Sequence, residues 1–380
     1  MGLVSATVYA LRIPFLESVR HSLAGRAWSD SVVVRVLDEE GAEGFGEAAP
    51  RPYVTGETPT DVVAHLARVL WPAVRGIAAP SLCGPADLAA LERLVPDDGP
   101  DAGRHHAARA ALELAIVDWA LRRRGVSAAA LLPPARDRVV YAGVISAESP
   151  PQAARQARWA RLAGLRQVKI KVGVGDDLAR VRAVREVLDP DVTIRADANG
   201  AWTPAVALAA VRQLARYGVA SVEQPISPGA PEILARLRSE SALPLVADES
   251  VVTPADADGL IAAGAVDAVN VRVSKCGGFA RSVAIARCAA AAGLEVHVGS
   301  HVGETAILAA AGRHLAAGLA TVAHVEGSYG TLLLVEDVSD DGLRFGHGGE
   351  ASLLTGPGWG ISVRVDRLRR HATTVVELAA

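Results

Sequence analysis

The stretch Gln167-Val-Lys-Ile-Lys-Val172 decides the fold that this sequence predicts. Its length and its β-branched residues indicate a short strand, in which successive side chains point to opposite faces. Lys169 and Lys171 therefore share one face. Two surface lysines on an edge strand are the alternative, but the apolar residues around them favour an inner strand of a barrel.

Seven similar runs of β-branched residues occur between residues 139 and 325, and Ala/Leu/Arg-rich helical stretches separate most of them. Eight strands that alternate with helices predict a (β/α)8 barrel. The other seven runs are Val139–Val144, Val192–Ala196, Ala220–Glu223, Leu245–Ala247, Ala268–Val273, Leu294–Val298 and Thr321–Val325.

The residues outside the barrel predict a second, smaller unit. Strands followed by helices in one block are typical of an α+β domain. We therefore expect an α/β fold with an α+β capping domain at residues 1–127, a (β/α)8-type barrel at 128–335, and a C-terminal segment at 336–380 that returns to the cap. In the cap, the sequence predicts strands at Val4–Leu11 and Ser31–Leu37 that frame a loop holding Glu17, Arg20 and His21. It also predicts a Gly-rich turn at Gly44–Glu47 and helices at Thr60–Val74, Ala86–Leu94 and Ala107–Arg124.

The composition excludes several classes of protein. Half of the residues are hydrophobic and 21% are charged, which suits a buried globular core. A net charge of −3 gives no general attraction for nucleic acid, and no apolar window is long enough to span a membrane. Three widely spaced cysteines and an N-terminus without a secretory pattern predict a cytoplasmic protein.

Polar residues follow successive strands of the predicted barrel. Lys171, Asp197, Glu223, Asp248 and Lys275 end strands two to six, at intervals of 25 to 27 residues, about one βα unit each. Active sites of such barrels lie at the carboxyl ends of the strands, so we expect these five side chains around one mouth. A single carboxylate there is often a helix N-cap, but three in succession between lysines favour a site.

This pattern indicates a metal and acid–base chemistry. Converging carboxylates repel one another unless a cation lies between them, and an all-oxygen set suits Mg²⁺ or Mn²⁺ better than Zn²⁺. A metal that ligates a substrate carboxylate stabilises the charge that develops when the α-proton is removed. Positive charge from the metal, Lys169 and Lys275 would favour the neutral, basic form of Lys171.

Five ordered motifs resemble the enolase superfamily, in particular its muconate lactonizing enzyme subgroup. They are Lys169-Ile-Lys171, Asp197-Ala-Asn199, Glu223-Gln-Pro225, Asp248-Glu-Ser250 and Lys275-Cys-Gly-Gly278. Gly44-Phe-Gly-Glu47 and Gly56-Glu-Thr58 are similar to that family's second capping loop, so the resemblance covers nearly the whole chain.

The resemblance implies a role for each residue of the mouth. Asp197, Glu223 and Asp248 would bind Mg²⁺, and Lys171 and Lys275 would be the acid/base groups on opposite faces of a small carboxylate substrate. Lys169 would tune Lys171 and touch the substrate carboxylate. Asn199 and Glu249 would support these groups. We also expect a homo-oligomer.

The ends of strands seven and eight depart from the family pattern. Gly299-Ser-His-Val-Gly-Glu304 is one residue longer than the usual segment, and His324-Val-Glu326 replaces the Asp-x-Asp of dipeptide epimerases. We therefore do not favour dipeptide epimerisation, and we interpret His297 as a packed barrel residue. The candidate substrate contacts are Arg20, His21, Tyr53, His301, Glu304 and Glu326.

Two lysines on opposite faces favour a racemase or epimerase of an amino-acid-derived carboxylate. A muconate-type cycloisomerase and a syn-dehydratase use the same parts and stay open as alternatives. A barrel that binds a ligand without chemistry would be expected to lack one of the five residues. A phosphate-binding barrel would use Gly277-Gly278 and the next helix N-terminus as its anion site.

Overall fold

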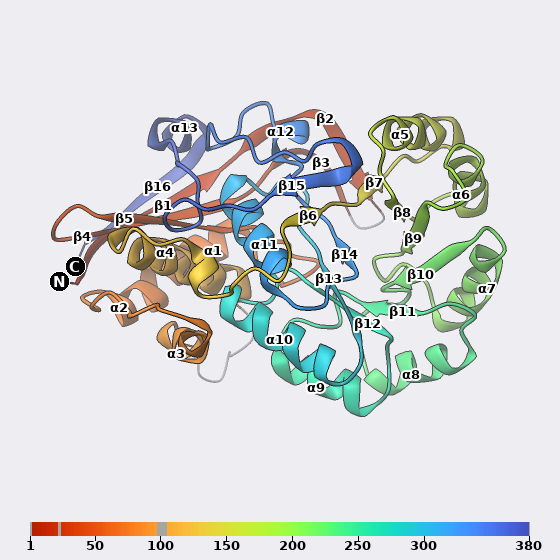
Figure 1. The fold of residues 1–380 in the computed structure, drawn as a ribbon, viewed down its shortest axis with the longest axis horizontal. Coiled ribbons are helices and arrows are strands. Elements are labelled where there is room, and N and C mark those ends of the chain that lie inside the picture. The colour runs from red at the N-terminus through yellow and green to blue at the C-terminus, as the bar shows by residue number, and fades with distance from the viewer. Residues whose placement is uncertain (1, 22–23, 97–104, 380) are drawn as a thin grey trace.

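The computed structural model describes residues 2–21, 24–96 and 105–379. Within residues 105–379, eight parallel strands follow one another in sequence order around a curled sheet (Figure 1). The Ala142 N–H, just before β7, donates to the Val325 carbonyl of β14 at 2.8 Å, which closes the sheet into a barrel. The strands are β7 Gly143–Ile145, β8 Gln167–Lys171, β9 Thr193–Asp197, β10 Val219–Glu223, β11 Leu245–Ala247, β12 Ala268–Val271, β13 Glu295–Val298 and β14 His324–Val325.

Helices cover the outside of the barrel, and their sequences explain where they begin. The Thr203 and Thr253 side chains accept hydrogen bonds from the first turns of α7 and α9, and a proline stands at the start of both helices. Ala207, Val211 and Leu214 of α7 are buried at helical spacing against the sheet. The outer helices are α5 Pro150–Leu162, α6 Asp177–Arg185, α7 Pro204–Ala215, α8 Pro231–Glu240, α9 Pro254–Ala262, α10 Phe279–Ala291 and α11 Ala306–Gly318.

An antiparallel sheet forms the cap, in the order β16-β1-β4-β5, with the two ends of the chain side by side (Figure 1). The C-terminal strand pairs with β1, and α4 packs across β5. Together with the barrel, this sheet confirms the predicted fold class. The elements are β1 Leu3–Leu11, β4 Val32–Asp38, β5 Glu43–Ala48, α1 Pro59–His65 with a π-helical turn at Leu66–Leu70, α2 Trp71–Val74, α3 Leu88–Leu94, α4 His106–Arg123, α12 Gly330–Leu333, α13 Val365–His371 and β16 Ala372–Ala379.

The buried carboxylate of Glu47 joins the cap to the barrel. It accepts hydrogen bonds from the Ser31 hydroxyl at 2.7 Å, from the backbone and hydroxyl of Thr305, and from the backbone N–H of Leu308. Thr305 and Leu308 belong to the start of α11, where N–H groups lack partners within the helix. The cap is thereby fixed above the strand-seven end of the barrel.

The first and last predicted barrel strands were too long. Residues 138–140 form β6, which pairs antiparallel with β15, Glu350–Ser352, and the barrel strand begins only at Gly143. The last strand, β14, is limited to His324–Val325. The local pattern could not reveal the first change because the partner of β6 lies about 200 residues later in the chain.

Two predictions in the cap were also wrong. The predicted loop that holds Glu17 is a hairpin of β2, Ile13–His21, and β3, Ala24–Ser29. Buried Ile13 and Phe15 alternate with exposed neighbours, a period-2 pattern that the loop interpretation overlooked. The predicted turn at Gly44–Glu47 is part of β5 instead, because its glycines permit close contact with α4.

We expect the substitution Gly46→Ala to destabilise the protein by about 3 kcal/mol, since overpacking against a rigid neighbour typically costs that much. A Cβ at Gly46 would lie 1.9 Å from the Ala111 carbonyl oxygen and 2.5 Å from the Ala115 nitrogen, both backbone atoms of α4. Urea unfolding measures the effect. Gly312→Ala in α11 is the control, because a Cβ there meets nothing within 4 Å. Equal midpoints for the two variants would contradict the expected clash.

Candidate active site

Three buried carboxylates surround the carboxyl ends of neighbouring strands. Asp197 and Glu223 are the last residues of β9 and β10, and Asp248 directly follows β11. The Lys169 ammonium joins two of them, at 3.1 Å from Asp197 Oδ2 and 3.2 Å from Glu223 Oε1. The Arg272 guanidinium contacts the third, Asp248, and lies 3.8 Å from Glu223. The structure thus brings the predicted carboxylates together.

Lysines stand on both sides of the carboxylates, and each has defined partners. Lys171 Nζ donates to Asp197 Oδ2 at 2.6 Å and to Asn199 Oδ1 at 2.8 Å. Lys275 is completely buried and donates to Asp248 Oδ1 at 2.8 Å and to the carbonyls of Asp248 and Asn270. The strand order β8-β9-β10-β11-β12 explains this arrangement, since lysine strands flank the three carboxylate strands.

The surroundings give the lysines different proton affinities. Burial alone would lower the pKa of Lys169, but the carboxylates of Glu223, Glu326 and Asp197 outweigh it and raise that pKa above its ordinary value. Burial lowers the pKa of Lys275 to about 8. Lys169 therefore keeps its proton at neutral pH, whereas Lys275 can lose one.

The choice of lysine rather than arginine at the mouth is a further indication of the site's chemistry. The sequence has 39 lysines and arginines, yet Lys169, Lys171 and Lys275 are its only lysines, and all three lie here. Arginine does not lose its proton in proteins, whereas a lysine can become neutral. The chain uses arginine at its other basic positions and lysine only at this mouth. This choice fits a site whose chemistry requires a side chain that can release a proton.

Sequence reasoning missed three residues of the site, Arg195, Asn270 and Arg272. Arg195 donates to Glu326 at 2.7 Å and lies 3.5 Å from Glu223, and the Asn270 amide donates to Glu223 at 2.9 Å. Strand periodicity could have found them. Arg195 lies two residues before Asp197 in β9 and therefore on the same face of the strand. Asn270 near the end of β12 and Arg272 directly after it are also two residues apart and share one face.

Cations surround the carboxylates of the mouth. Among the described residues, Lys169, Lys171, Arg195, Arg272 and Lys275 contact Asp197, Glu223, Asp248 and Glu326. Glu249 accepts a hydrogen bond from Asn199 instead, and burial raises the pKa of its carboxyl group.

The donor set fits a hard divalent cation. Asp197, Glu223 and Asp248 supply oxygen atoms alone, which Mg²⁺ prefers. The Arg272 guanidinium contacts the buried Asp248 Oδ2, so a positive group already lies on the side of this oxygen where a metal ion would bind.

A cavity of about 430 Å³ opens above the lysines. Lys169, Lys171, Asn199, Glu249 and Arg272 form its polar floor, whereas Lys275 is not among its lining residues. Of the predicted substrate contacts, Tyr53, His301, Glu304 and Glu326 line the cavity. The backbones of Arg20 and His21 belong to β2, but their side chains lie outside what the structure describes.

The long strand-seven end folds into a buried turn at the cavity wall. Glu304 Oε1 accepts a hydrogen bond from the His301 backbone N–H at 2.6 Å, and burial raises the pKa of Glu304 to about 8. The ring nitrogens of His301 are buried and make no hydrogen bond to any described residue. His301 is therefore equipped to bond with a ligand, and Glu304 is a neutral acid near pH 7.

The strand-eight residues lie at different depths in the barrel. Glu326 lies at the mouth, where its oxygens pair with Lys169 at 2.5 Å and Arg195 at 2.7 Å. His324 lies two residues earlier, deeper in the barrel, where its ring meets that of His297. Glu326 is thus the only acid at the two positions where dipeptide epimerases carry Asp-x-Asp. Its carboxylate is already paired with Lys169 and Arg195.

The anion site of the phosphate-binding alternative is filled by the protein itself. The Glu113 carboxylate of α4 accepts a hydrogen bond from the Ala280 N–H at the start of α10, at 3.0 Å. It lies where a Cβ on Gly278 would be placed, and it pairs with Arg109 at 2.9 Å. Because Gly278 has no side chain, the Glu113 carboxylate can occupy the place where an anion would bind.

Comparisons with known proteins agree with this geometry. Residues 152–367 match the family described as "Enolase C-terminal domain-like". The chain is 29% identical to the L-Ala-D/L-Glu epimerase of Bacillus subtilis, covering 95% of this chain and 97% of that protein. It is 27% identical to muconate cycloisomerase 1 of Rhodococcus opacus, covering 97% and 98%.

Solved structures give the same result. The N-succinyl Arg/Lys racemase of Bacillus cereus superposes with a TM-score of 0.90 at 27% identity, over all of both chains. A dipeptide epimerase of Enterococcus faecalis, solved with Mg and the dipeptide L-Leu-L-Tyr, gives 0.85 at 29% identity, over 95% of this chain and all of that one. No helix in the described ranges is long and apolar enough to cross a membrane. The chain belongs to the mandelate racemase and muconate lactonizing enzyme group of the enolase superfamily and is an isomerase.

Proposed function

We propose that this enzyme moves a proton at the α-carbon of an amino-acid-derived carboxylate, as a racemase or epimerase. The observation that carries the proposal is the strand order around the mouth. Lys171 on β8 contacts the first carboxylate, Asp197, and Lys275 after β12 contacts the last, Asp248. Removal of a proton from one face and its return to the other requires acid/base groups on two sides.

We propose that Asp197, Glu223 and Asp248 hold Mg²⁺, with Mn²⁺ as a substitute. When bound, the ion supplies Lewis-acid stabilisation of the negative charge that develops on the substrate carboxylate. The all-oxygen donor set supports this assignment. The dipeptide epimerase structure with Mg supports it independently.

Each of the three lysines has a separate role in the proposed reaction. Lys169 keeps its proton and pairs with the substrate carboxylate at the floor of the cavity. Lys171, in its neutral form, takes the α-proton, and Asn199 orients it through the bond to Nζ. We assign the return of a proton to the other face to Lys275, which must first exchange its bonds to Asp248 and Asn270 for the substrate because it does not line the cavity in this structure. Its lowered pKa suits a group that gains and loses protons near neutrality.

We propose a substrate whose α-nitrogen is acylated and which carries no free ammonium. Glu326 is already paired with two cations, and Glu304 is neutral near pH 7 because of its raised pKa. A free ammonium would therefore find little negative charge deep in the cavity. Trp159 and Leu332 line it as partly exposed apolar side chains, which suits an apolar acyl or amino-acid side chain.

Cycloisomerisation of a muconate-type diacid, or syn-elimination of water, is the second candidate. The similarity to muconate cycloisomerase 1 along nearly the whole chain favours it. These reactions need one lysine to exchange a proton, whereas racemisation needs two.

Turnover in D₂O distinguishes the two proposals. N-acyl amino acids, dipeptides, free amino acids and muconate-type diacids are incubated with enzyme and Mg²⁺, and products are followed by mass spectrometry and optical rotation. We expect racemised N-acyl amino acids that carry deuterium at the α-carbon in both product and recovered substrate. Conversion of a diacid to a lactone, with no exchange in any amino-acid derivative, would contradict racemisation.

The domain bounds at residues 127 and 335, the homo-oligomeric state and the cytoplasmic location stay predictions. Sedimentation or size-exclusion measurements of the purified chain would test the oligomer.

A further inference from the structure

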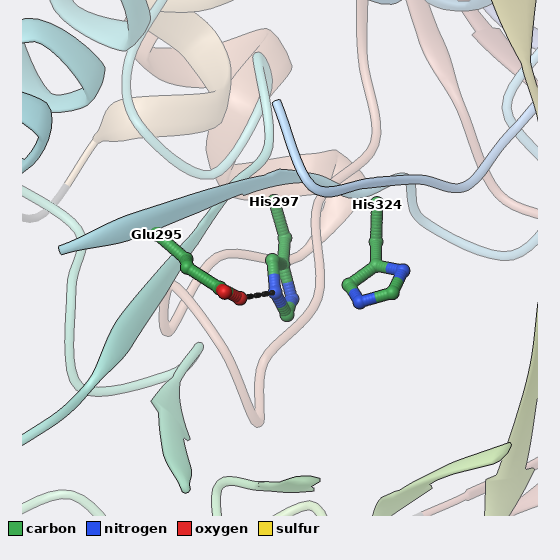
Figure 2. A group of neighbouring side chains, drawn as sticks. All are labelled: Glu295, His297 and His324. Carbon is green, nitrogen blue, oxygen red and sulfur yellow. Dashed lines mark ion pairs between the residues drawn. The ribbon is translucent and has the colours of Figure 1, made fainter. Parts of the chain in front are cut away.

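A second group of possible metal ligands lies at the opposite end of the barrel from the carboxylates. Glu295 and His324 are the first residues of β13 and β14, and His297 lies two residues after Glu295 on the same face. The register of the two strands pairs His297 with His324. Figure 2 shows the three side chains pointing to the same side.

The three side chains are close enough to share one ion. His297 Nε2 lies 3.8 Å from Glu295 Oε2, and the two imidazole rings meet edge to face with centroids 4.6 Å apart. One ligand atom from each residue lies within 4.8 Å of the other two. Tetrahedral Zn²⁺ holds its ligands about 3.3 Å apart, given bonds of about 2.0–2.1 Å. A modest approach of the exposed Glu295 side chain and the His324 ring would complete the geometry.

An unsatisfied buried atom independently indicates a ligand. His297 is 2% exposed, and its Nε2 has no close hydrogen-bond partner among the described residues, since the nearest carboxylate oxygen, Glu295 Oε2, lies 3.8 Å away. A buried polar atom left without a partner typically costs about 1–3 kcal/mol, so native proteins seldom leave one unsatisfied without a reason. This nitrogen is the atom that faces Glu295.

His324 is already oriented as a metal ligand. Its Nδ1 lies 2.8 Å from the side-chain oxygen of Gln167, which accepts a hydrogen bond. The Nδ1 atom therefore carries the proton, and Nε2 keeps its lone pair. Histidines that bind metals are held in this way by a hydrogen bond from the other ring nitrogen.

We propose that Glu295, His297 and His324 form a Zn²⁺ site at the amino-terminal end of the barrel. Two imidazoles and one carboxylate are a usual zinc donor set, and the partial exposure of Glu295 and His324 leaves the fourth position to water. This set selects against Mg²⁺, which prefers the oxygen-only ligands at the mouth.

Arg195 connects the two ends of the barrel. Its guanidinium lies 3.4 Å from His297 Nδ1 and also contacts Glu223 and Glu326 at the mouth. In this structure Arg195 can only donate to His297 Nδ1. With zinc on Nε2, the neutral ring would carry its proton on Nδ1, so the Arg195 guanidinium would have to turn from His297 toward Glu223 and Glu326. The proposed site therefore shares one residue with the active site without sharing a ligand.

The test measures zinc binding to the full chain with millimolar Mg²⁺ present to fill the mouth. Equilibrium dialysis with metal analysis should give one equivalent of Zn²⁺ for each chain, and Co²⁺ in its place should give the visible absorption of a tetrahedral site. His324→Ala should weaken zinc binding by more than the roughly 10–100-fold expected from loss of an outer partner alone. Glu295→Gln alters a mostly exposed side chain outside the core, and it should weaken zinc binding less.

Two controls separate this site from others. His347→Ala removes an exposed histidine elsewhere, and Asp248→Asn alters the mouth, so both should bind zinc as the wild-type chain does. The proposal is overturned if the wild-type chain binds no more zinc than His324→Ala, or if Mg²⁺ displaces the zinc. An equal loss of zinc binding in His347→Ala would also overturn the proposal, because it would show that zinc binds to scattered surface histidines.

Discussion

Lys171→Ala should reduce turnover and α-proton exchange by at least about 10³-fold, within the range that general acid–base catalysis contributes. Lys171 lines the cavity, and its Nζ contacts only Asp197 and Asn199 among the described residues for which hydrogen bonds are resolved. Its loss removes the base on one face of the substrate. Magnesium affinity, followed by calorimetric titration, should persist because the three carboxylates are unchanged.

Lys171→Arg tests whether Lys171 acts as a base or only as a positive charge. Arginine keeps the positive charge beside Asp197 but does not give up its proton at neutral pH. It should therefore be as inactive as Lys171→Ala while it binds the substrate carboxylate more tightly. Either variant with wild-type exchange in D₂O would remove Lys171 as the base.

Asp248→Asn should lower Mg²⁺ affinity and turnover together, by about 10-fold or more, because metal affinity depends on the number of charged ligands. Asp248 is fully buried, and its two oxygens contact the cations Lys275 and Arg272, which shows that the site attracts positive charge. High Mg²⁺ concentrations should restore part of the activity, which a merely structural defect would not permit. Calorimetric titration and kcat/KM at several Mg²⁺ concentrations measure both quantities.

Asp267→Asn is the matched control. Asp267 directly precedes β12 at the other end of the barrel, where it accepts hydrogen bonds from the Leu245 N–H and from Arg238. It should leave the Mg²⁺ titration unchanged. An unchanged titration for Asp248→Asn would exclude that residue as a ligand.

Much of the active site followed from local patterns. Alternation in Gln167–Lys171 put two lysines on one face, and the regular interval between Lys171, Asp197, Glu223 and Asp248 put their side chains at one height. These features depend on the period of a strand and the length of a βα unit, which neighbouring residues encode. The (β/α)8 barrel itself was predictable for the same reason.

Other features depended on contacts between distant parts of the chain. The pairing of β6 with β15, the Glu113 carboxylate at the start of α10, and the seclusion of Lys275 from the cavity could not be read from any local segment. Local sequence patterns therefore identified the three lysines and three carboxylates at the mouth, but not Arg195, Asn270 or Arg272. Which side chains face the cavity and which are held by buried partners followed only from the three-dimensional structure, because burial and ion pairing depend on residues far apart in the chain.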